Sequence, residues 1–433
     1  MFRFKLFLVF LIPIFALLFI PFGMVNASLN AKYIFLFIGD GMGFPQVKLA
    51  EAFYGSLTMC NLKVKGEVAT YAANKEVPDS AASATALATG YKTLNGILGM
   101  DPLKTEKLKT IAYMAKERGM KVGIITNTPL DDATPAAFYS NQPSRLNYYE
   151  ISLDLISSGF DYFVGGRPLG NSDRYRKGKP DILKLAEKKG YSIIKGEREL
   201  KSLKSNKNKV IVLDQAPTLY YEIDRPLGSL SLADLLRIGI ECLYGSSGFL
   251  MIVEGGKIDW ACHANDAMTA IAEVKSFDEA IKVALDFYNK HPRETLIVVT
   301  ADHETGGMEL DLSEKKYKYL AFQKVSYAKF NMELFRLKSK PYDKRRLYSL
   351  IENCFGFTIS EREANLLEED ERKLTFKLIR ILNEKAGIKW KTAGHTATSV
   401  PIFAHGVGAE LFEGFIDNTD VAKNIMRIAG LVF

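Results

Sequence analysis

The fold is decided by Phe249-Leu250-Met251-Ile252-Val253, an uninterrupted apolar run, and by Glu254-Gly255-Gly256-Lys257-Ile258-Asp259-Trp260-Ala261-Cys262-His263, which follows it. A short run without polar residues is typical of a strand covered on both faces. Asp259 and His263 are four residues apart, which places both side chains on one face of a helix, where they can bind one metal ion. Glu254, at the strand end, remains free for another ion. Capping acids beside a surface histidine are the alternative, and the combined spacing favours metal binding.

Similar apolar runs recur along the chain, separated by segments of helical length and periodicity such as 107–118 and 264–289. The other runs are 33–38, 122–126, 162–164, 192–194, 210–213, 296–300 and 401–404. Strands that alternate with helices predict an α/β fold, a three-layer sandwich around a central, largely parallel β-sheet. Ligands bind such sheets at the carboxyl ends of the strands, so the polar residues just after the runs are the candidate site.

The alternation stops between about residues 311 and 391, where the chain is charged, aromatic and mostly helical in pattern. Ser360-Glu361-Arg362-Glu363 has the spacing of a capping box and predicts the start of one helix there. We therefore expect one catalytic domain, residues 28–433, that carries a mostly helical cap as an insertion.

The first 27 residues have the three parts of a signal peptide. Arg3 and Lys5 precede a long apolar run, 6–22, and Val25-Asn26-Ala27 resembles a cleavage site with small residues. We expect removal of residues 1–27 and export to the periplasm, the cell surface or the medium. An uncleaved membrane anchor is the alternative, although the two prolines and the glycine at 13, 21 and 23 disfavour a stable spanning helix.

The composition is that of an ordinary globular protein, with 47% hydrophobic and 25% charged residues among 433. The net charge of +7 falls to +5 without Arg3 and Lys5, and this mild excess does not suggest nucleic-acid binding. Four cysteines, with no C-x-x-C spacing, leave both disulfides and unpaired buried thiols open. They are Cys60, Cys242, Cys262 and Cys354.

Two more strand ends carry possible metal ligands. The run 33–38 leads into Gly39-Asp40-Gly41-Met42-Gly43, and the run 296–300 leads into Ala301-Asp302-His303-Glu304-Thr305-Gly306-Gly307. A third motif, Thr392-Ala393-Gly394-His395-Thr396, precedes the run 401–404. A plain glycine-rich turn explains the first motif equally well when it is taken alone. Three of the five histidines fall in such motifs, however, and we expect the other two, His291 and His405, to be structural.

A nucleophile is suggested by Pro78-Asp79-Ser80-Ala81-Ala82-Ser83-Ala84-Thr85-Ala86. The small residues after Asp79 favour a helix, which places Ser80 near a helix N-terminus that stabilises negative charge. A capped packing helix is the alternative. Asp131-Asp132-Ala133-Thr134-Pro135-Ala136-Ala137 offers oxygen ligands for Mg²⁺, and Arg145 offers a two-pronged phosphate contact. A capped helix and a surface arginine would explain these residues if they stood alone.

Taken together, these motifs resemble the alkaline phosphatase family in order from Asp40 to His395. The resemblance implies hydrolysis of phosphate monoesters through a phosphoserine at Ser80, two zinc ions, a third metal that is usually magnesium, and a homodimer. It also implies a role for each candidate residue. Asp259, His263 and His395 would hold the first zinc; Asp40, Asp302 and His303 the second; Asp40, Thr134 and Glu254 the third metal, with Asp132 steadying its waters; and Arg145 would grip the phosphate.

One position departs from the family pattern. Trp260 follows Asp259 where much of the family has a lysine or a histidine. An indole neither ligates a metal nor carries charge, so the identity of the third metal and the strength of phosphate binding stay open. The cap carries no motif that indicates a substrate, and a membrane partner is expected only if the leader is not cleaved.

Two relatives and one unrelated class are the competing interpretations. A sulfatase needs a C/S-x-P-x-R setting, which Ser80 lacks. A phosphodiesterase of the same superfamily commonly uses a threonine nucleophile and lacks the arrangement around Arg145. A non-catalytic phosphate- or metal-binding protein would lack a nucleophile or a ligand, and none is missing from these motifs.

Overall fold

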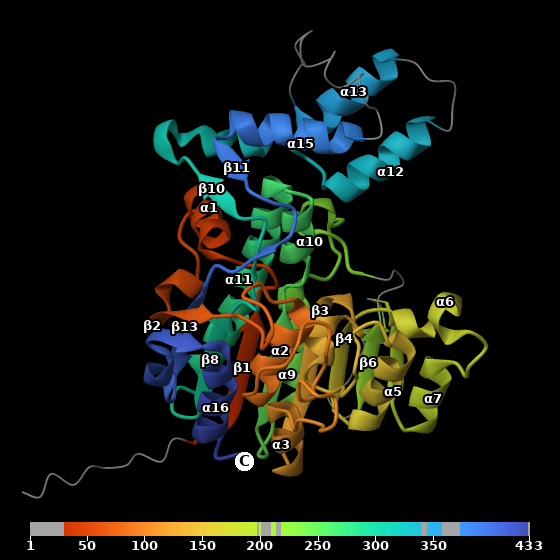
Figure 1. Cartoon of the computed structure of the whole chain (residues 1–433), viewed down its shortest axis with the longest axis vertical. Coiled ribbons are helices and arrows are strands. Elements are labelled where there is room, and N and C mark those ends of the chain that lie inside the picture. Colours follow the sequence, from red (N-terminus) through yellow and green to blue (C-terminus); the bar gives the residue numbers. More distant parts are fainter. Residues whose placement is uncertain are drawn as a thin grey trace, which may run out of the picture.

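Ten strands form the central sheet of this computed structural model (Figure 1). In chain order they are β1 (Tyr33–Ile38), β2 (Val64–Ala69), β3 (Lys121–Pro129), β4 (Tyr162–Gly166), β5 (Ser192–Lys195), β6 (Val210–Leu213), β7 (Phe249–Glu254), β8 (Thr295–Thr300), β13 (Val400–Gly406) and β14 (Gly414–Asp417). Their order in the sheet is β14-β2-β13-β8-β1-β7-β3-β4-β6-β5. Every apolar run that was predicted to be a strand forms one of these strands, so the predicted α/β fold with a largely parallel sheet is confirmed.

The structure describes residues 30–196, 199–200, 209–213, 218–338, 344–356 and 373–431. The expected signal peptide, residues 1–27, and the expected capping box at Ser360 lie outside these ranges. Within the described ranges, no helix combines the length and the apolar character needed to cross a membrane.

Strands β2 and β14 were not predicted. Val64 and Val68 of β2 are buried while Lys65 between them is exposed, so this strand has polar residues where the central strands have none. Strand β14 is only partly buried and forms the edge of the sheet. A strand near an edge buries less surface than a central one and therefore carries a weaker apolar signal.

One strand runs against the others. β13 pairs antiparallel with both β8 and β2, whereas the remaining pairs of the sheet are parallel. The start of β13 therefore lies at the edge where its parallel neighbours end. This reversal brings the segment before Val400 to the carboxyl ends of β8 and β1.

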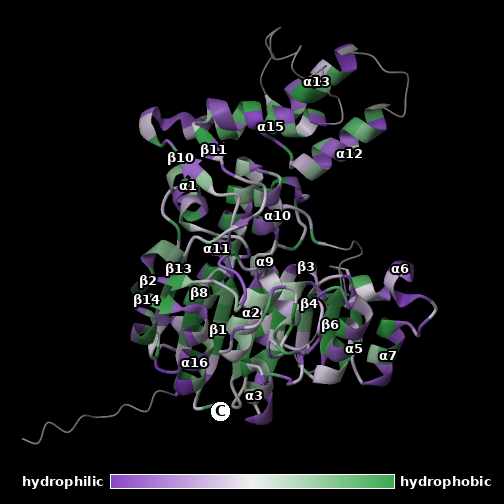
Figure 2. Ribbon diagram, in the orientation of Figure 1, coloured by the Kyte–Doolittle hydropathy of each residue, from purple (hydrophilic) through white to green (hydrophobic). Residues whose placement is uncertain are grey.

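Helices cover both faces of the sheet, which completes the three layers (Figure 1). On one face α9 (Leu232–Leu243) and α11 (Ala267–Tyr288) pack together, with α1 (Phe44–Tyr54) and α10 (Lys257–His263) against α11. On the other face α2 (Ser80–Thr89), α3 (Ile111–Glu117) and α16 (Asn418–Ala429) pack on one another. Helices α4 (Ala133–Ala136), α5 (Tyr148–Ser158), α6 (Asp173–Arg176) and α7 (Ile182–Lys188) follow β3 and β4. Figure 2 shows the hydrophobic strands enclosed by these helices.

The described part of the expected cap region is mostly helical. It leaves the main body through β10 (Met308–Leu310) and returns through β11 (Ile388–Trp390), which pair antiparallel. Between them lie η4 (Ser313–Phe322), α12 (Tyr327–Lys338), α13 (Lys344–Phe355) and α15 (Leu374–Lys385). Figure 1 shows α12, α13 and α15 at one end of the molecule, beyond α10.

Candidate active site

The predicted site residues come together because the strands that carry them are neighbours. β8, β1, β7 and β3 are consecutive in the sheet, and the register places Ile38 opposite both Glu254 and Thr300. The parallel strands thus end level with one another, and Asp40 and Asp302 follow two of these ends. His395 reaches the same edge from the other direction, because it precedes the antiparallel β13.

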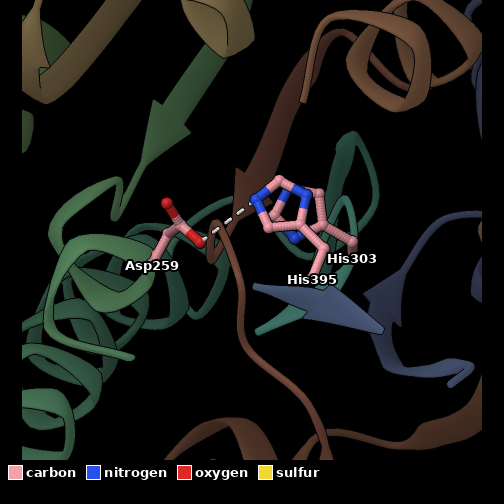
Figure 3. Close-up of side chains that lie close together, drawn as sticks. All are labelled: Asp259, His303 and His395. Carbon is pink, nitrogen blue, oxygen red and sulfur yellow. Dashed lines mark ion pairs between the residues drawn. The ribbon is translucent and has the colours of Figure 1, made fainter. Parts of the chain in front are cut away.

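The first group is Asp259, His263 and His395. Asp259 and His263 lie one turn apart on α10, with 3.2 Å between Oδ2 of the carboxylate and Nε2 of the imidazole. His395 Nε2 lies 3.7 Å from Asp259 Oδ1 and 3.2 Å from His263 Nε2. Figure 3 shows Asp259 facing the ring of His395, which stacks on the ring of His303 with 3.6 Å between ring centroids.

The second nitrogen of each ring explains how these histidines are oriented. His263 Nδ1 lies 2.5 Å from the carbonyl oxygen of Ala393, and His395 Nδ1 lies 2.9 Å from that of Pro78. A ring nitrogen that faces a carbonyl oxygen must be the donor, so both Nε2 atoms are left to face Asp259 and each other. Two imidazole nitrogens and a carboxylate that converge in this way fit a zinc ion.

The second group is Asp40, Asp302 and His303. Nε2 of the buried His303 lies 3.5 Å from Asp40 Oδ1 and 3.2 Å from Asp302 Oδ2. These two carboxylate oxygens are buried and have no hydrogen-bond partner among the described residues. Burial, and next the charge of Asp302, raises the pKa of Asp40 well above its usual range, and burial raises the pKa of Asp302 to about 7. Two buried carboxylate oxygens that receive no hydrogen bond fit a divalent cation that is bound between them.

His303 also lies close to the first group, since Asp259, His303 and His395 have ligand atoms within 4.8 Å of one another. Burial, and next the neighbouring His395, lowers the pKa of His303 well below its usual value. The ring is therefore neutral at physiological pH. A neutral imidazole offers the lone pair that a metal ion requires.

The residues expected to hold the third metal make fewer direct contacts with one another than those of the first two groups. Thr134, in α4, donates from Oγ1 to Asp40 Oδ2 over 3.1 Å. Glu254 accepts hydrogen bonds from Thr126 and Thr128, and in the described part of the chain it makes none with Asp40 or Thr134. Burial raises its pKa to about 8, although Thr126 opposes this, and the nearby charge of Asp132 adds to the rise. The structure thus brings Asp40 and Thr134 into contact and places Glu254 near them without a direct bond.

Ser80 is the first residue of α2, as predicted. Asp79 caps this helix by accepting from the backbone N–H of Ala82, and Ser80 is only 4% exposed. Its Oγ lies 3.2 Å from His303 Nε2, beside the second group. Arg145 extends toward the same helix end, 3.3 Å from Asp79 Oδ2 and 3.3 Å from Asp132 Oδ1. A hydroxyl, a guanidinium and a helix N-terminus arranged in this way fit a phosphoryl group chemically.

Thr305 contacts two of the candidate ligands, a role that its sequence motif did not predict. Its hydroxyl donates to Asp259 Oδ1 over 2.6 Å and lies 3.2 Å from His303 Nδ1. Since that hydroxyl proton is committed to Asp259, Thr305 accepts from the ring, which orients His303 Nε2 toward Ser80 and the second group. The position of Thr305 two residues after His303 was the available signal, because alternate residues of an extended segment share a face.

A family model described as alkaline phosphatase matches residues 31–161 and 165–431. The chain belongs to the alkaline phosphatase family. Alkaline phosphatase 4 of Bacillus subtilis (strain 168) is 30% identical over 419 residues, which cover 92% of this chain and 88% of that one. A crystal structure of a cold-active alkaline phosphatase from a psychrophilic Shewanella is 32% identical, with a TM-score of 0.82 and coverage of 92% of this chain and 99% of that one.

A third similar protein contains a bound metal ion. A mutant of TAB5 alkaline phosphatase with magnesium bound in its M3 site is 26% identical, with a TM-score of 0.68, and the match covers 93% of this chain and 99% of that one. Membership of the family makes this alkaline phosphatase a phosphoric monoester hydrolase.

The four cysteines of the chain are all unpaired, so the question that the sequence left open is answered in favour of free thiols.

The crowded acids predict how this alkaline phosphatase responds to pH when its metals are removed. The raised pKa values of Glu254 and Asp302 (about 8 and about 7) and of His263 (about 9, from its hydrogen bond with Asp259) mean that the folded state binds more protons than the unfolded one. The free energy of unfolding therefore falls as pH rises from 6.5 toward 9. The lowered pKa of His303 acts in the opposite direction only below pH 6.5.

Thermal unfolding of the chelated protein across this pH range measures the effect. The melting temperature should fall with rising pH without metal, and the fall should become smaller when divalent metal ions are added. A metal-free protein whose melting temperature rises between pH 6.5 and 9 would contradict the burial of these acids at a shared site.

Proposed function

We propose that this alkaline phosphatase transfers the phosphoryl group of a phosphate monoester to Ser80 and then to water, with two zinc ions and a third ion, magnesium. The observation that supports this most directly is the position of Ser80 Oγ, 3.2 Å from His303 Nε2, at the N-terminus of α2. At this point the nucleophile adjoins His303, which belongs to the second ligand group and lies within 4.8 Å of ligand atoms of Asp259 and His395 in the first.

Contacts among the side chains support the first two of the three proposed ligand sets. Asp259, His263 and His395 would hold one zinc ion; Asp40, Asp302 and His303 the other; Asp40, Thr134 and Glu254 would hold magnesium, with Asp132 beside them. When bound, such ions stabilise the charge on the attacking and leaving oxygens and lower the pKa of a coordinated hydroxyl or water.

The protein's own residues would carry the transfer in two steps. In the first, Ser80 Oγ forms a bond to phosphorus while the bond from phosphorus to the ester oxygen breaks, and the alcohol leaves with a proton. In the second, a water oxygen replaces Ser80 Oγ on phosphorus, which restores the serine and releases phosphate. Arg145 would hold the phosphoryl oxygens throughout, with its guanidinium kept in place by Asp79 and Asp132.

Hydrolysis of p-nitrophenyl phosphate at alkaline pH tests this proposal. The purified protein would be assayed as isolated, after removal of metals by a chelator, and after zinc and magnesium are restored. We expect activity to disappear with chelation and to return with the metals. Activity that survives complete chelation would instead indicate that His303 acts as a general base toward Ser80. A folded protein that is inactive in every metal state would contradict the proposed mechanism.

Trp260 provides a test of how tightly product phosphate is held. It follows Asp259 on α10 and is partly buried against the core. Replacing it with lysine adds a cation beside the proposed metal sites, so we expect Trp260→Lys to lower the inhibition constant of phosphate several-fold. Trp260→Phe, which adds no charge, is the matched control. An inhibition constant for Trp260→Lys that is unchanged or higher would show that a positive charge at this position does not stabilise bound phosphate.

Three further expectations stay with this proposal. Residues 1–27 would be a leader that directs export, and residues 28–433 would form one catalytic domain with a cap at about 311–391. The enzyme would act as a homodimer on small phosphate monoesters. Mass analysis of the N-terminus of the exported protein and light scattering of the purified enzyme test the leader and the dimer.

A further inference from the structure

A buried glutamine contacts three of the segments that carry the proposed metal ligands. Gln46 lies in α1, is fully buried, and accepts at Oε1 from the backbone N–H of Gly43 over 3.1 Å. Its Nε2 donates to the carbonyl oxygen of Thr305 over 2.9 Å and lies 3.7 Å from Cys262 Sγ. Gly43 follows Asp40 closely, Thr305 follows His303, and Cys262 precedes His263. One amide side chain therefore touches each of these three segments.

A buried glutamate extends this contact to the fourth segment. Glu304 is 1% exposed and accepts from Gln46 Nε2 over 2.9 Å and from the backbone N–H of Gly307 over 3.0 Å. Its other oxygen accepts from the hydroxyl of Thr396, the residue after His395, over 2.5 Å. The short strands β9 (Glu304–Thr305) and β12 (His395–Thr396) pair antiparallel here, with Glu304 opposite Thr396 and Thr305 opposite His395.

The absence of a side chain at Gly43 leaves the space that this buried pair occupies. A Cβ on Gly43 would lie 2.2 Å from Cγ of Glu304, so only glycine leaves room for the glutamate at that point. Glu304 has no ligand atom in the metal groups that the structure brings together, and both polar atoms of the Gln46 amide are hydrogen-bonded elsewhere. Their polar atoms are occupied by bonds to the backbone, to each other and to Thr396. The buried pair thus links the segments that hold the ligands while taking no part as a ligand.

We infer that Gln46 and Glu304 are positioning residues that set the distance between the two proposed zinc sites, an inference that rests on the proposed function. Through Gln46 they tie the Asp40 loop to α10 and to β9. Through Thr396 they hold His395 over His303, so that its Nε2 faces Asp259. Residues that orient metal ligands in this way typically change metal affinity about 10- to 100-fold when they are replaced.

Zinc binding to the full chain, measured by competition with a chelator, tests this inference, with unfolding of the metal-free protein measured alongside. We expect Glu304→Ala and Gln46→Leu to weaken zinc binding by about 10- to 100-fold. Glu304→Gln should retain most of the affinity. Its carbonyl can accept from Gln46 and its amide can donate to Thr396, whose hydroxyl already lies 3.1 Å from Thr398 Oγ1. A purely structural role would lower the stability of the metal-free protein without this pattern of zinc affinities.

Thr396→Val keeps the inference testable if the alanine variant fails to fold, because it removes one hydroxyl and preserves the shape. We expect it to weaken one of the two zinc ions, the one near His395, and to leave the other unchanged. Thr398→Val is the matched control and should bind both ions as the wild type does. Wild-type zinc affinity in Glu304→Ala, or in Thr396→Val where the former does not fold, would overturn the inference. A wild-type protein that binds no zinc would instead refute the proposed function.

Discussion

Replacing Ser80 with alanine is expected to lower kcat for p-nitrophenyl phosphate by about 10³-fold or more, because it removes the hydroxyl that lies beside His303 at the N-terminus of α2. The substitution removes one oxygen from a buried helix start whose cap, Asp79, is unaffected. Zinc content and thermal stability should therefore stay close to those of the wild type. Steady-state kinetics together with metal analysis of the same preparation measure both parts of this expectation.

A second alanine substitution in the same helix is the control. Thr89 donates to the carbonyl oxygen of Thr85 within α2 and touches none of the proposed ligands. Thr89→Ala removes a buried hydroxyl from this helix, so any loss through helix packing alone should appear there too. If Ser80→Ala kept more than about a tenth of the wild-type kcat while Thr89→Ala was fully active, Ser80 would not be the nucleophile.

Replacing His303 with alanine is expected to reduce activity by a similar factor, about 10³-fold, but with loss of metal. His303 is fully buried, belongs to the second ligand group, lies close to Asp259 and His395 of the first, and lies beside Ser80. Its removal leaves Asp40 and Asp302 without the neutral donor that completes their set. We expect the purified variant to contain at least one zinc ion fewer per chain than the wild type, and added zinc to restore little activity.

Substitution of His405 is the control for the substitution of His303. Its Nδ1 accepts from the backbone N–H of Lys63, away from the ligand groups. His405→Gln should retain both the zinc content and the kcat of the wild type. Equal metal content in His303→Ala and in the wild type would show that His303 is not a ligand, and would leave its contact with Ser80 to explain any loss of activity.

Much of the site could be predicted from the sequence because its members lie at the ends of strongly apolar strands. The strand before Glu254 and the helical spacing of Asp259 and His263 are local features, set by residues adjacent in the chain. The same holds for Ser80, whose helix begins where a capping aspartate meets a run of small residues. Local patterns of this kind survive folding because they depend on backbone geometry over a few residues.

Other features carried no local signal. Gln46 lies within α1, and nothing in that helix indicates that its amide will meet Glu304 from a segment 258 positions away. The edge strands β2 and β14 were missed because partly exposed strands tolerate charged residues. The cysteines could not be assigned as free from their number alone, since pairing depends on the approach of distant segments.

By itself, the sequence determined which chemical groups stand at the strand ends and at the start of α2, because strand and helix periods act over neighbouring residues. Only the tertiary structure decided that these groups converge. The order β8-β1-β7-β3 places parallel strand ends side by side, and the reversal of β13 returns His395 to the same edge. The distances between Nε2 atoms and carboxylate oxygens depend on the packing of segments hundreds of residues apart, which no local pattern encodes.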